Sequence, residues 1–197
     1  MLKIGLTGGI GCGKSTASLF LKELGAYIFD ADIEAKKLLT NNPTVQSELI
    51  AEFGTDIMGP SNTISREKLS HIVFQDEDHQ MRLNLVVHPY IYDLIDEQFE
   101  KIISEKKHFM FVVDGAMIFE SGYDQHLDYV ILITAILKNR MARVIARGIL
   151  TREEILQRME FQWSEKEKIG LADFVIHNDG SEEDLKKEIT DIFQKIV

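Results

Sequence analysis

The chain has 197 residues, and 45% of them are hydrophobic, which is enough to bury one sizeable core and excludes a disordered segment. Its 22 basic and 32 acidic side chains give a net charge of −10, which argues against a duplex DNA or RNA binder because such proteins need a basic face. The chain has a single cysteine and no Cys/His cluster with zinc-ligand spacing. It shows no signal-peptide pattern and no apolar run near the roughly 20 residues that span a bilayer. These features favour a cytoplasmic protein with no membrane partner.

The first predicted element is a short apolar strand at Leu2–Thr7, followed by a glycine-rich loop and a helical pattern over Ser15–Leu24. The loop reads G-x-x-x-x-G-K-S from Gly8 to Ser15, and the order strand, loop, helix is the context in which this pattern binds phosphate. Its backbone N–H groups and the amino terminus of the helix surround the anion. The alternative, a glycine turn that only packs a strand on a helix, does not require the lysine and serine. We therefore expect a site for a nucleoside triphosphate.

Three side chains of this loop are assigned distinct tasks. Lys14 is predicted to reach the β- and γ-phosphates, Ser15 to offer a hydroxyl to Mg²⁺, and Thr16 to donate to phosphate. Cys12 is interpreted as a small filler, although a helix amino terminus also favours a thiolate. The predicted nucleotide-binding residues of this segment are Gly8, Gly9, Gly11, Cys12, Gly13, Lys14, Ser15 and Thr16.

A second apolar strand is predicted at Ala26–Phe29, and it leads into Asp30-Ala31-Asp32. The carboxyl ends of parallel strands meet at one edge of a sheet, so these two carboxylates should lie on the side of the phosphate loop. There a carboxylate can take a proton from an attacking hydroxyl or help to hold Mg²⁺. The alternative is a helix N-cap. We favour Asp32 as the functional residue and Asp30 as the cap or a supporting group.

A long segment, Ile33–His108, separates the second strand from the third and shows helical patterns but no convincing strand. Apolar residues at three- and four-residue spacing predict a long helix, or a helix broken around Pro89. Because ligands of α/β proteins bind beyond the carboxyl ends of the strands, we expect this insertion to lie over the phosphate site. A purely structural cap is the alternative. His88 could touch substrate there, although a lone histidine is more often structural.

The remaining strands are predicted at Phe109–Val113, Tyr129–Thr134 and Phe174–His177. All five strands are nearly continuous apolar runs, and helical segments separate them, so the fold class is a doubly wound parallel α/β sheet. Asp114 follows the third strand in the manner of a Walker B acid, which holds Mg²⁺ directly or through water. Glu120 is predicted to form a salt bridge or a cap.

Five basic and no acidic residues lie between Asp128 and Glu153. Arg140, Arg143 and Arg147 have the spacing of one helix face, which could close over the triphosphate as a lid and offset its charge. A solvated helix face is the alternative. The lone tryptophan, Trp163, is expected to be a packing anchor. Three capping boxes in the carboxyl-terminal part of the chain each predict the start of a helix. These capping boxes pair Thr151 with Glu154, Ser164 with Glu167, and Ser181 with Asp184.

With these residues established, the chain resembles the dephospho-CoA kinases along nearly its whole length. The loop alone fits many kinases, so the resemblance rests on an ordered set of motifs. In chain order the set comprises Gly5 to Thr16, Asp30-Ala31-Asp32, His88-Pro89, Ile118-Phe119-Glu120-Ser121-Gly122, Arg143 and Arg147 ahead of Thr151-Arg152-Glu153-Glu154, Gln162, Ala172-Asp173 and Asn178-Asp179-Gly180.

The resemblance implies transfer of the γ-phosphoryl group of ATP to the ribose 3′-hydroxyl of dephospho-CoA. Asp32 then matches the base, Arg143 and Arg147 match lid arginines, and Asn178 to Gly180 lie where the adenine of ATP is held. It also implies three parts. These are a nucleotide-binding core at 1–32, 105–136 and 171–197, a helical substrate domain at 33–104, and an arginine-bearing lid at 137–170.

The chain departs from the family pattern at three positions: Ala116 stands where proline is frequent, Arg140 where glutamine is usual, and Cys12 where serine or alanine is common. None of these removes a group that the chemistry needs. Two other functions are weighed: a nucleoside-monophosphate-type kinase with another acceptor, and a regulatory switch that hydrolyses GTP. Against the switch, the Asn-Lys-x-Asp guanine signature is missing from the sequence. Nothing in the sequence indicates an oligomeric state.

Overall fold

The computed structural model describes residues 1–60, 63–148 and 151–197. Two compact units make up the chain: one combines residues 1–30 with 97–197, and the other comprises residues 31–96. Within the described ranges, no helix combines the length and the apolarity needed to cross a bilayer.

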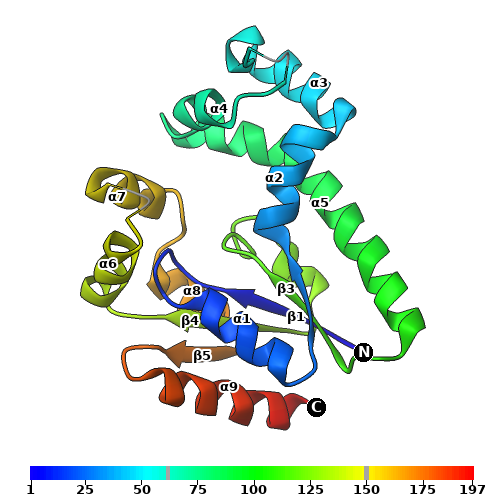
Figure 1. Ribbon diagram of the computed structural model, residues 1–197, viewed down its shortest axis with the longest axis vertical. Helices are drawn as coiled ribbons and strands as arrows, with labels where there is room; N and C mark the ends of the chain where they lie inside the picture. Colours follow the sequence, from blue (N-terminus) through cyan, green and yellow to red (C-terminus); the bar gives the residue numbers. More distant parts are fainter. Residues whose placement is uncertain (61–62, 149–150) are drawn as a thin grey trace. The chain divides into compact units, whose positions relative to one another are not determined.

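A five-stranded parallel sheet forms the centre of the first unit (Figure 1). The strand order is β2-β3-β1-β4-β5, and the strands are β1 (Leu2–Thr7), β2 (Tyr27–Asp30), β3 (Met110–Asp114), β4 (Tyr129–Thr134) and β5 (Phe174–His177). This confirms the five expected strands, although β2 and β3 each begin and end one residue later than the apolar runs suggest. The last residues of these two strands, Asp30 and Asp114, are therefore direct partners in the sheet register.

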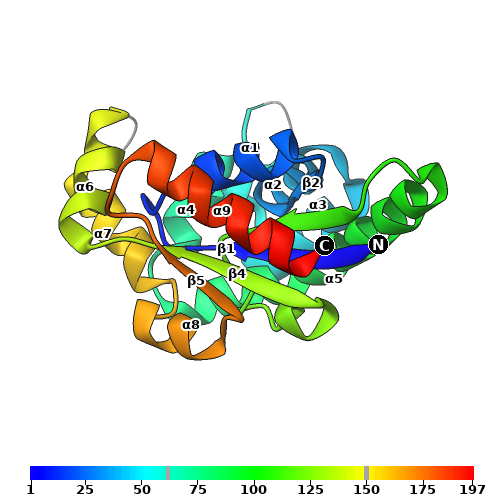
Figure 2. The same cartoon turned by 90° about the horizontal axis from the view of Figure 1, so that it is seen from below.

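Helices cover both faces of this sheet. The helices of the first unit are α1 (Lys14–Glu23), the carboxyl-terminal part of α5 (Glu77–Glu105), η2 (Tyr123–His126), α6 (Leu137–Ala146), α7 (Arg152–Glu160), α8 (Glu165–Leu171) and α9 (Glu182–Ile196). The helices α1 and α9 lie side by side on one face, and α8 lies on the opposite face (Figure 2). All three expected capping boxes, at Thr151, Ser164 and Ser181, are formed at the starts of α7, α8 and α9.

Strand residues that alternate along the chain form two different cores. Ile4 and Ile131 point toward α1 and α9, where they pack with Leu21 and Ile189 in one buried cluster. The opposite face carries aromatic contacts. Phe111 packs edge-on against Phe99 of α5, with the two ring centroids 5.3 Å apart. The alternation explains how nearly continuous apolar strands serve two layers of helices.

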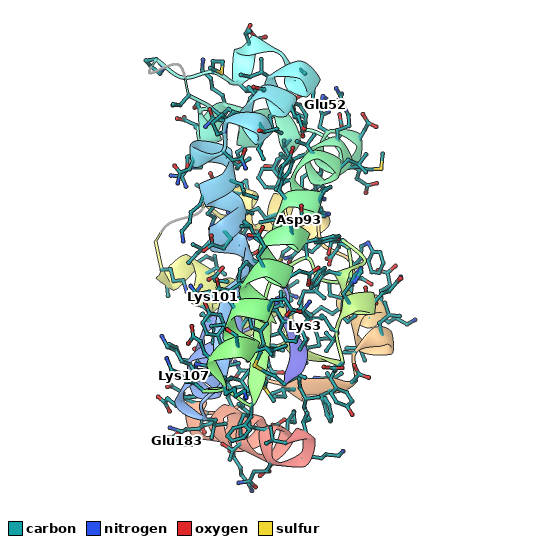
Figure 3. The ribbon with its side chains drawn as sticks, turned by 90° about the vertical axis from the view of Figure 1, so that its right-hand side faces the viewer. Lys3, Glu52, Asp93, Lys101, Lys107 and Glu183 are labelled. Atoms are coloured by element: carbon teal, nitrogen blue, oxygen red, sulfur yellow. The ribbon has the colours of Figure 1, made fainter. Side chains whose placement is uncertain are left out.

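The ammonium group of Lys3, at the start of β1, is placed against the carboxyl-terminal part of α5 (Figure 3). Its Nζ atom lies 4.8 Å from the centroid of the Phe99 ring and donates a hydrogen bond of 3.1 Å to the Tyr123 hydroxyl. This cation–π contact and hydrogen bond join α5 and η2 to the sheet.

The second unit is helical. It consists of α2 (Ala31–Asn41), α3 (Pro43–Phe53), η1 (Thr55–Ile57), α4 (Arg66–Val73) and the amino-terminal part of α5. Its described residues contain an isolated bridge between Met58 and Ile64 but no strand, as the sequence led us to expect. The helix α5 continues through Pro89 over 29 residues, so of the two alternatives for this segment the unbroken helix is the one observed.

Candidate active site

The loop between β1 and α1 is built from glycines because neighbouring groups approach its backbone closely. A Cβ atom on Gly8 would lie 2.3 Å from the carbonyl oxygen of Ile133 in β4. Gly13 has φ of 102°, and a Cβ atom there would lie 2.2 Å from Nδ2 of Asn178. Both positions therefore exclude a side chain. At Gly8 the obstacle is a backbone oxygen, and at Gly13 it is the Asn178 side chain together with the left-handed backbone conformation. The loop ends at the amino terminus of α1, whose first residue is Lys14.

The tip of the loop is held by side chains that are distant in the sequence. The N–H group of Ile10 donates to Oε1 of Gln162 over 3.2 Å, and the carbonyl oxygen of Ile10 accepts from Nε of Arg140 over 2.9 Å. Both polar groups of one loop residue are thus satisfied by the segment that runs from α6 to α8. This contact fixes the peptide planes on either side of Ile10.

The middle of the loop is held from the other side, at the carbonyl oxygen of Cys12. This oxygen accepts hydrogen bonds from Nδ2 of Asn178, at 2.8 Å, and from Nη1 of Arg143, at 3.3 Å. Arg143 also donates to the carbonyl oxygen of Asn178 over 2.8 Å. Asn178 is buried and Gly180 is exposed. Cys12 is buried as a filler, and burial raises the pKa of its thiol.

Lys14 forms an ion pair with Asp114, the last residue of β3. Both side chains are largely buried, and Ser18 of α1 also hydrogen-bonds to the Asp114 carboxylate. Burial raises the pKa of Asp114, and the positive charge of Lys14 opposes that rise. The pair places the ammonium group at the carboxyl edge of the sheet beside the loop, which is the position a phosphate-binding lysine requires.

The carboxylates that follow β2 lie in different elements. Asp30 ends β2 beside Asp114, whereas Asp32 lies in the first turn of α2. His88 is half-buried within α5, its ring stacks on Tyr92 with centroids 5.9 Å apart, and burial lowers its pKa. Asp32 and His88 belong to the helical unit, so their approach to the loop remains a prediction.

The three arginines that the sequence predicts on one helix face have different surroundings. Arg140 is buried and forms an ion pair with Glu165 of α8, in addition to its bond to Ile10. Burial raises the pKa of Glu165, and the charge of Arg140 opposes that rise. Arg143 is half-buried, and Arg147 is exposed directly after the last residue of α6. Their common role toward a triphosphate remains a prediction, and residues 149 and 150 of the predicted lid lie outside the described residues.

The predicted metal ligands provide oxygen atoms. Ser15 is exposed at the start of α1, and the Asp114 carboxylate lies at the neighbouring strand end. Hydroxyl and carboxylate oxygens are the donors that Mg²⁺ prefers, so the chemistry of the pair fits this ion. Across the described part of the chain, no group of three or more histidine, cysteine, aspartate or glutamate side chains could hold a metal ion by itself.

A second buried ion pair joins Glu120 to Lys168, a partner that the sequence did not indicate. Nζ of Lys168 in α8 lies 2.6 Å from Oε1 of Glu120, and the two side chains are 1% and 5% exposed. The same oxygen accepts the backbone N–H of Trp163 over 2.9 Å. The salt bridge expected for Glu120 is therefore formed, whereas Trp163 is 46% exposed and the expectation of a packing anchor is wrong. Neither Lys168 nor Gln162 carries a local pattern that predicts its long-range partner.

The sheet order, the glycine loop and the lysine at its end define a P-loop kinase fold. A similar fold occurs in shikimate kinase from Acinetobacter baumannii in complex with shikimate, with a TM-score of 0.52 and 16% identity over 100% of this chain and 93% of that chain. At this identity the likeness concerns the fold alone.

The sequence model of one protein family, described as dephospho-CoA kinase, matches residues 2–184 of this chain. A dephospho-CoA kinase of Salinibacter ruber is 35% identical over 193 residues, covering 98% of this chain and 96% of the relative. The structure of TT1252 from Thermus thermophilus has a TM-score of 0.82 at 32% identity, covering 100% and 98% of the two chains. Dephospho-CoA kinase from Campylobacter jejuni has a TM-score of 0.69 at 30% identity, covering 98% and 96%. The chain belongs to the dephospho-CoA kinase family.

Proposed function

We propose that this protein transfers the γ-phosphoryl group of ATP to the ribose 3′-hydroxyl of dephospho-CoA and so forms coenzyme A. The observation that carries the proposal is the phosphate loop, whose lysine pairs with a strand-end carboxylate, in a chain that matches its family over residues 2–184. The family match favours this acceptor over those of nucleoside-monophosphate kinases. It also favours a small-molecule acceptor over the role of a regulatory switch.

The loop residues from Gly8 to Thr16 bind the triphosphate through backbone N–H groups, which need no rearrangement of charge when phosphate enters. Lys14 exchanges its partner, the Asp114 carboxylate, for the β- and γ-phosphates. Arg143 and Arg147 offset the charge on the migrating phosphoryl group. Asn178 and Gly180 lie on the side of the adenine of ATP.

Asp32 accepts the proton of the 3′-hydroxyl as the oxygen attacks the γ-phosphorus. A carboxylate suits this task because in-line transfer needs an oriented oxygen more than a strong base. His88 contacts the acceptor. In this scheme residues 1–32, 105–136 and 171–197 form the nucleotide core, residues 33–104 bind the acceptor, and residues 137–170 form the lid.

Ser15 and Asp114 would hold Mg²⁺ together with phosphate oxygens. When bound, this ion neutralises charge on the β- and γ-phosphates. The release of Asp114 from Lys14 would free its carboxylate for this purpose, either directly or through water. A small-molecule kinase with a single buried cysteine and a net charge of −10 fits a cytoplasmic enzyme with neither nucleic acid nor membrane as a partner.

An acceptor comparison tests the proposal. ADP release is measured with ATP and magnesium beside dephospho-CoA, AMP, CMP, shikimate or no acceptor. We expect turnover with dephospho-CoA to exceed that with the other acceptors by at least about 10³-fold, because a nucleoside site rejects acceptors that leave its polar groups unpaired. Equal turnover with AMP, or ADP release that no acceptor accelerates, would contradict the assignment.

The roles of two side chains are tested by matched pairs of variants. Asp32→Asn should lower kcat by about 10²–10⁴-fold with little change in ATP affinity. Its control, Asp56→Asn at an exposed carboxylate of η1, should leave kcat unchanged. A fully active Asp32→Asn enzyme refutes the assigned base.

Arg147→Ala should lower kcat without lowering the melting temperature. Its control is Lys138→Ala on α6, which should leave kcat unchanged.

A further inference from the structure

A cavity of about 410 Å³ lies behind the tip of the phosphate loop, within the first unit. Gly9 of the loop forms one edge, and the remaining walls come from β4, α6, α7, α8 and the α7–α8 connection. Leu132, Leu156 and Trp163 contribute apolar and aromatic surface. A volume of this size with mostly apolar walls and a few polar groups is typical of a small-molecule site. Of the residues given roles toward the nucleotide above, Gly9 and Arg140 line this cavity, whereas Lys14, Asp32, Arg143 and Arg147 do not.

The charges in the cavity wall favour an uncharged occupant. Arg140 is paired with Glu165, and Lys168 is paired with Glu120, so both cations of the wall are already neutralised by carboxylates. The remaining charged residue of the lining, Glu160, is itself acidic and offers nothing to an anion. A phosphate group would have to displace one of these buried pairs. A flat, neutral ring needs no such exchange, and it can lie along the half-exposed indole of Trp163 while its edge meets polar wall groups.

The chemistry of the acceptor specifies which ring can lie there. In dephospho-CoA the reacting hydroxyl is on the ribose, and the adenine is attached to that same sugar. When the hydroxyl faces the phosphoryl group on the loop, the base must therefore lie within the length of one nucleoside of the loop. The pantetheine arm leaves from the other side of the sugar through two phosphates. None of the residues that line the cavity belongs to 178–180, where the resemblance locates the adenine of ATP.

The walls of the cavity also hold the loop. Arg140 and Gln162 line it, and these are the side chains that bind the carbonyl and N–H groups of Ile10. A ring in the cavity would contact the two side chains that also hold Ile10. Acceptor binding would therefore restrain the loop tip beside the phosphoryl group that is to be transferred.

We propose that this cavity binds the adenine ring of the acceptor nucleotide, with Trp163 as its stacking surface and Arg140 and Gln162 as its link to the phosphate loop. The inference rests on the proposed function and adds to it the binding site for the base of the acceptor.

The first experiment uses the intrinsic fluorescence of the wild-type enzyme, because Trp163 is the single tryptophan of the chain. Dephospho-CoA and AMP are each expected to change the emission saturably, whereas pantetheine 4′-phosphate at the same concentrations is not. Turnover of dephospho-CoA is measured in the same preparation. If the enzyme phosphorylates dephospho-CoA but saturating dephospho-CoA leaves the emission unchanged, the cavity proposal is overturned while the proposed function stands. Absence of turnover overturns the function itself.

The second experiment fills the cavity. Leu156→Phe is expected to raise the KM for dephospho-CoA by about tenfold and to leave the KM for ATP within about twofold, because added volume competes with the ring. Leu171→Phe is the matched control, since Leu171 is an exposed leucine of α8 outside the cavity lining, and it should change neither KM. A Leu156→Phe enzyme with both KM values unchanged, or with only the KM for ATP raised, contradicts the proposal.

Discussion

Replacing Lys168 by methionine tests how the ion pair with Glu120 contributes to stability. The variant keeps the length of the side chain but removes the cation, so the Glu120 carboxylate remains 95% buried with the Trp163 N–H group as a donor to Oε1. Its other oxygen, Oε2, is buried and has no hydrogen-bond partner among the described residues. The substitution therefore leaves a buried carboxylate without its cation.

The burial of the pair sets the expected magnitude, since the two side chains are 1% and 5% exposed. Removing one partner of a buried ion pair usually costs roughly 3–5 kcal/mol, because the other charge is left without compensation. The free energy of unfolding of Lys168→Met should therefore fall below that of the wild-type protein by roughly 3–5 kcal/mol.

Urea denaturation followed by the emission of Trp163 measures this deficit, because the Trp163 backbone lies directly against the ion pair. The control is Lys186→Met, which removes an exposed cation 2.8 Å from Glu23 and should have only a small effect on the free energy of unfolding. Removing both charges, with Lys168→Met and Glu120→Leu together, should restore most of the lost stability. A deficit as small as that of the control, or a double variant no more stable than Lys168→Met alone, would show that the buried pair does not stabilise the fold in this way.

Three further predictions concern the loop, the lid and the helical unit. Gly8→Ala should weaken ATP-analogue binding by at least about tenfold in equilibrium titration, since its Cβ would meet a β4 carbonyl at 2.3 Å. Arg143→Ala should lower kcat by about 10²-fold in steady-state assays. Burial lowers the folded-state pKa of His88 below its ordinary value, so the unfolded chain binds this proton more readily and stability is lost as pH falls below about 6.5. His88→Gln should accordingly lose less thermal stability than wild type between pH 7 and pH 5.

The strands, the capping boxes and the loop were predictable from the sequence because each depends on local chemistry. An apolar run bounded by polar residues defines a buried parallel strand, and the pair Ser181 and Asp184 suffices to begin α9. The phosphate loop is also local, since the glycines, Lys14 and the start of α1 lie within a few residues of one another. Even so, the strand ends at Asp30 and Asp114 were missed by one residue, because acidic residues contribute nothing to an apolar run.

The contacts that hold the loop were not predictable, because each joins residues far apart in the chain. Ile10 meets Gln162 across 152 positions, and Arg140 finds its carboxylate, Glu165, on a different helix. The helix-face spacing of the arginines did not distinguish the buried Arg140 from the exposed Arg147, and their role as a lid stays a prediction. Trp163 was misjudged for the same reason. Whether a large aromatic ring is covered depends on which helices pack beside it, and this is decided by the tertiary fold.

We propose above that the loop from Gly8 to Thr16 binds a triphosphate and that Lys14 leaves Asp114 to do so. Calorimetric titration with a non-hydrolysable ATP analogue and magnesium tests this binding. We expect magnesium-dependent binding to the wild-type protein and a loss of at least about tenfold in affinity for Lys14→Met. Equal affinity for the two proteins, or no measurable binding to folded wild-type protein, would contradict it.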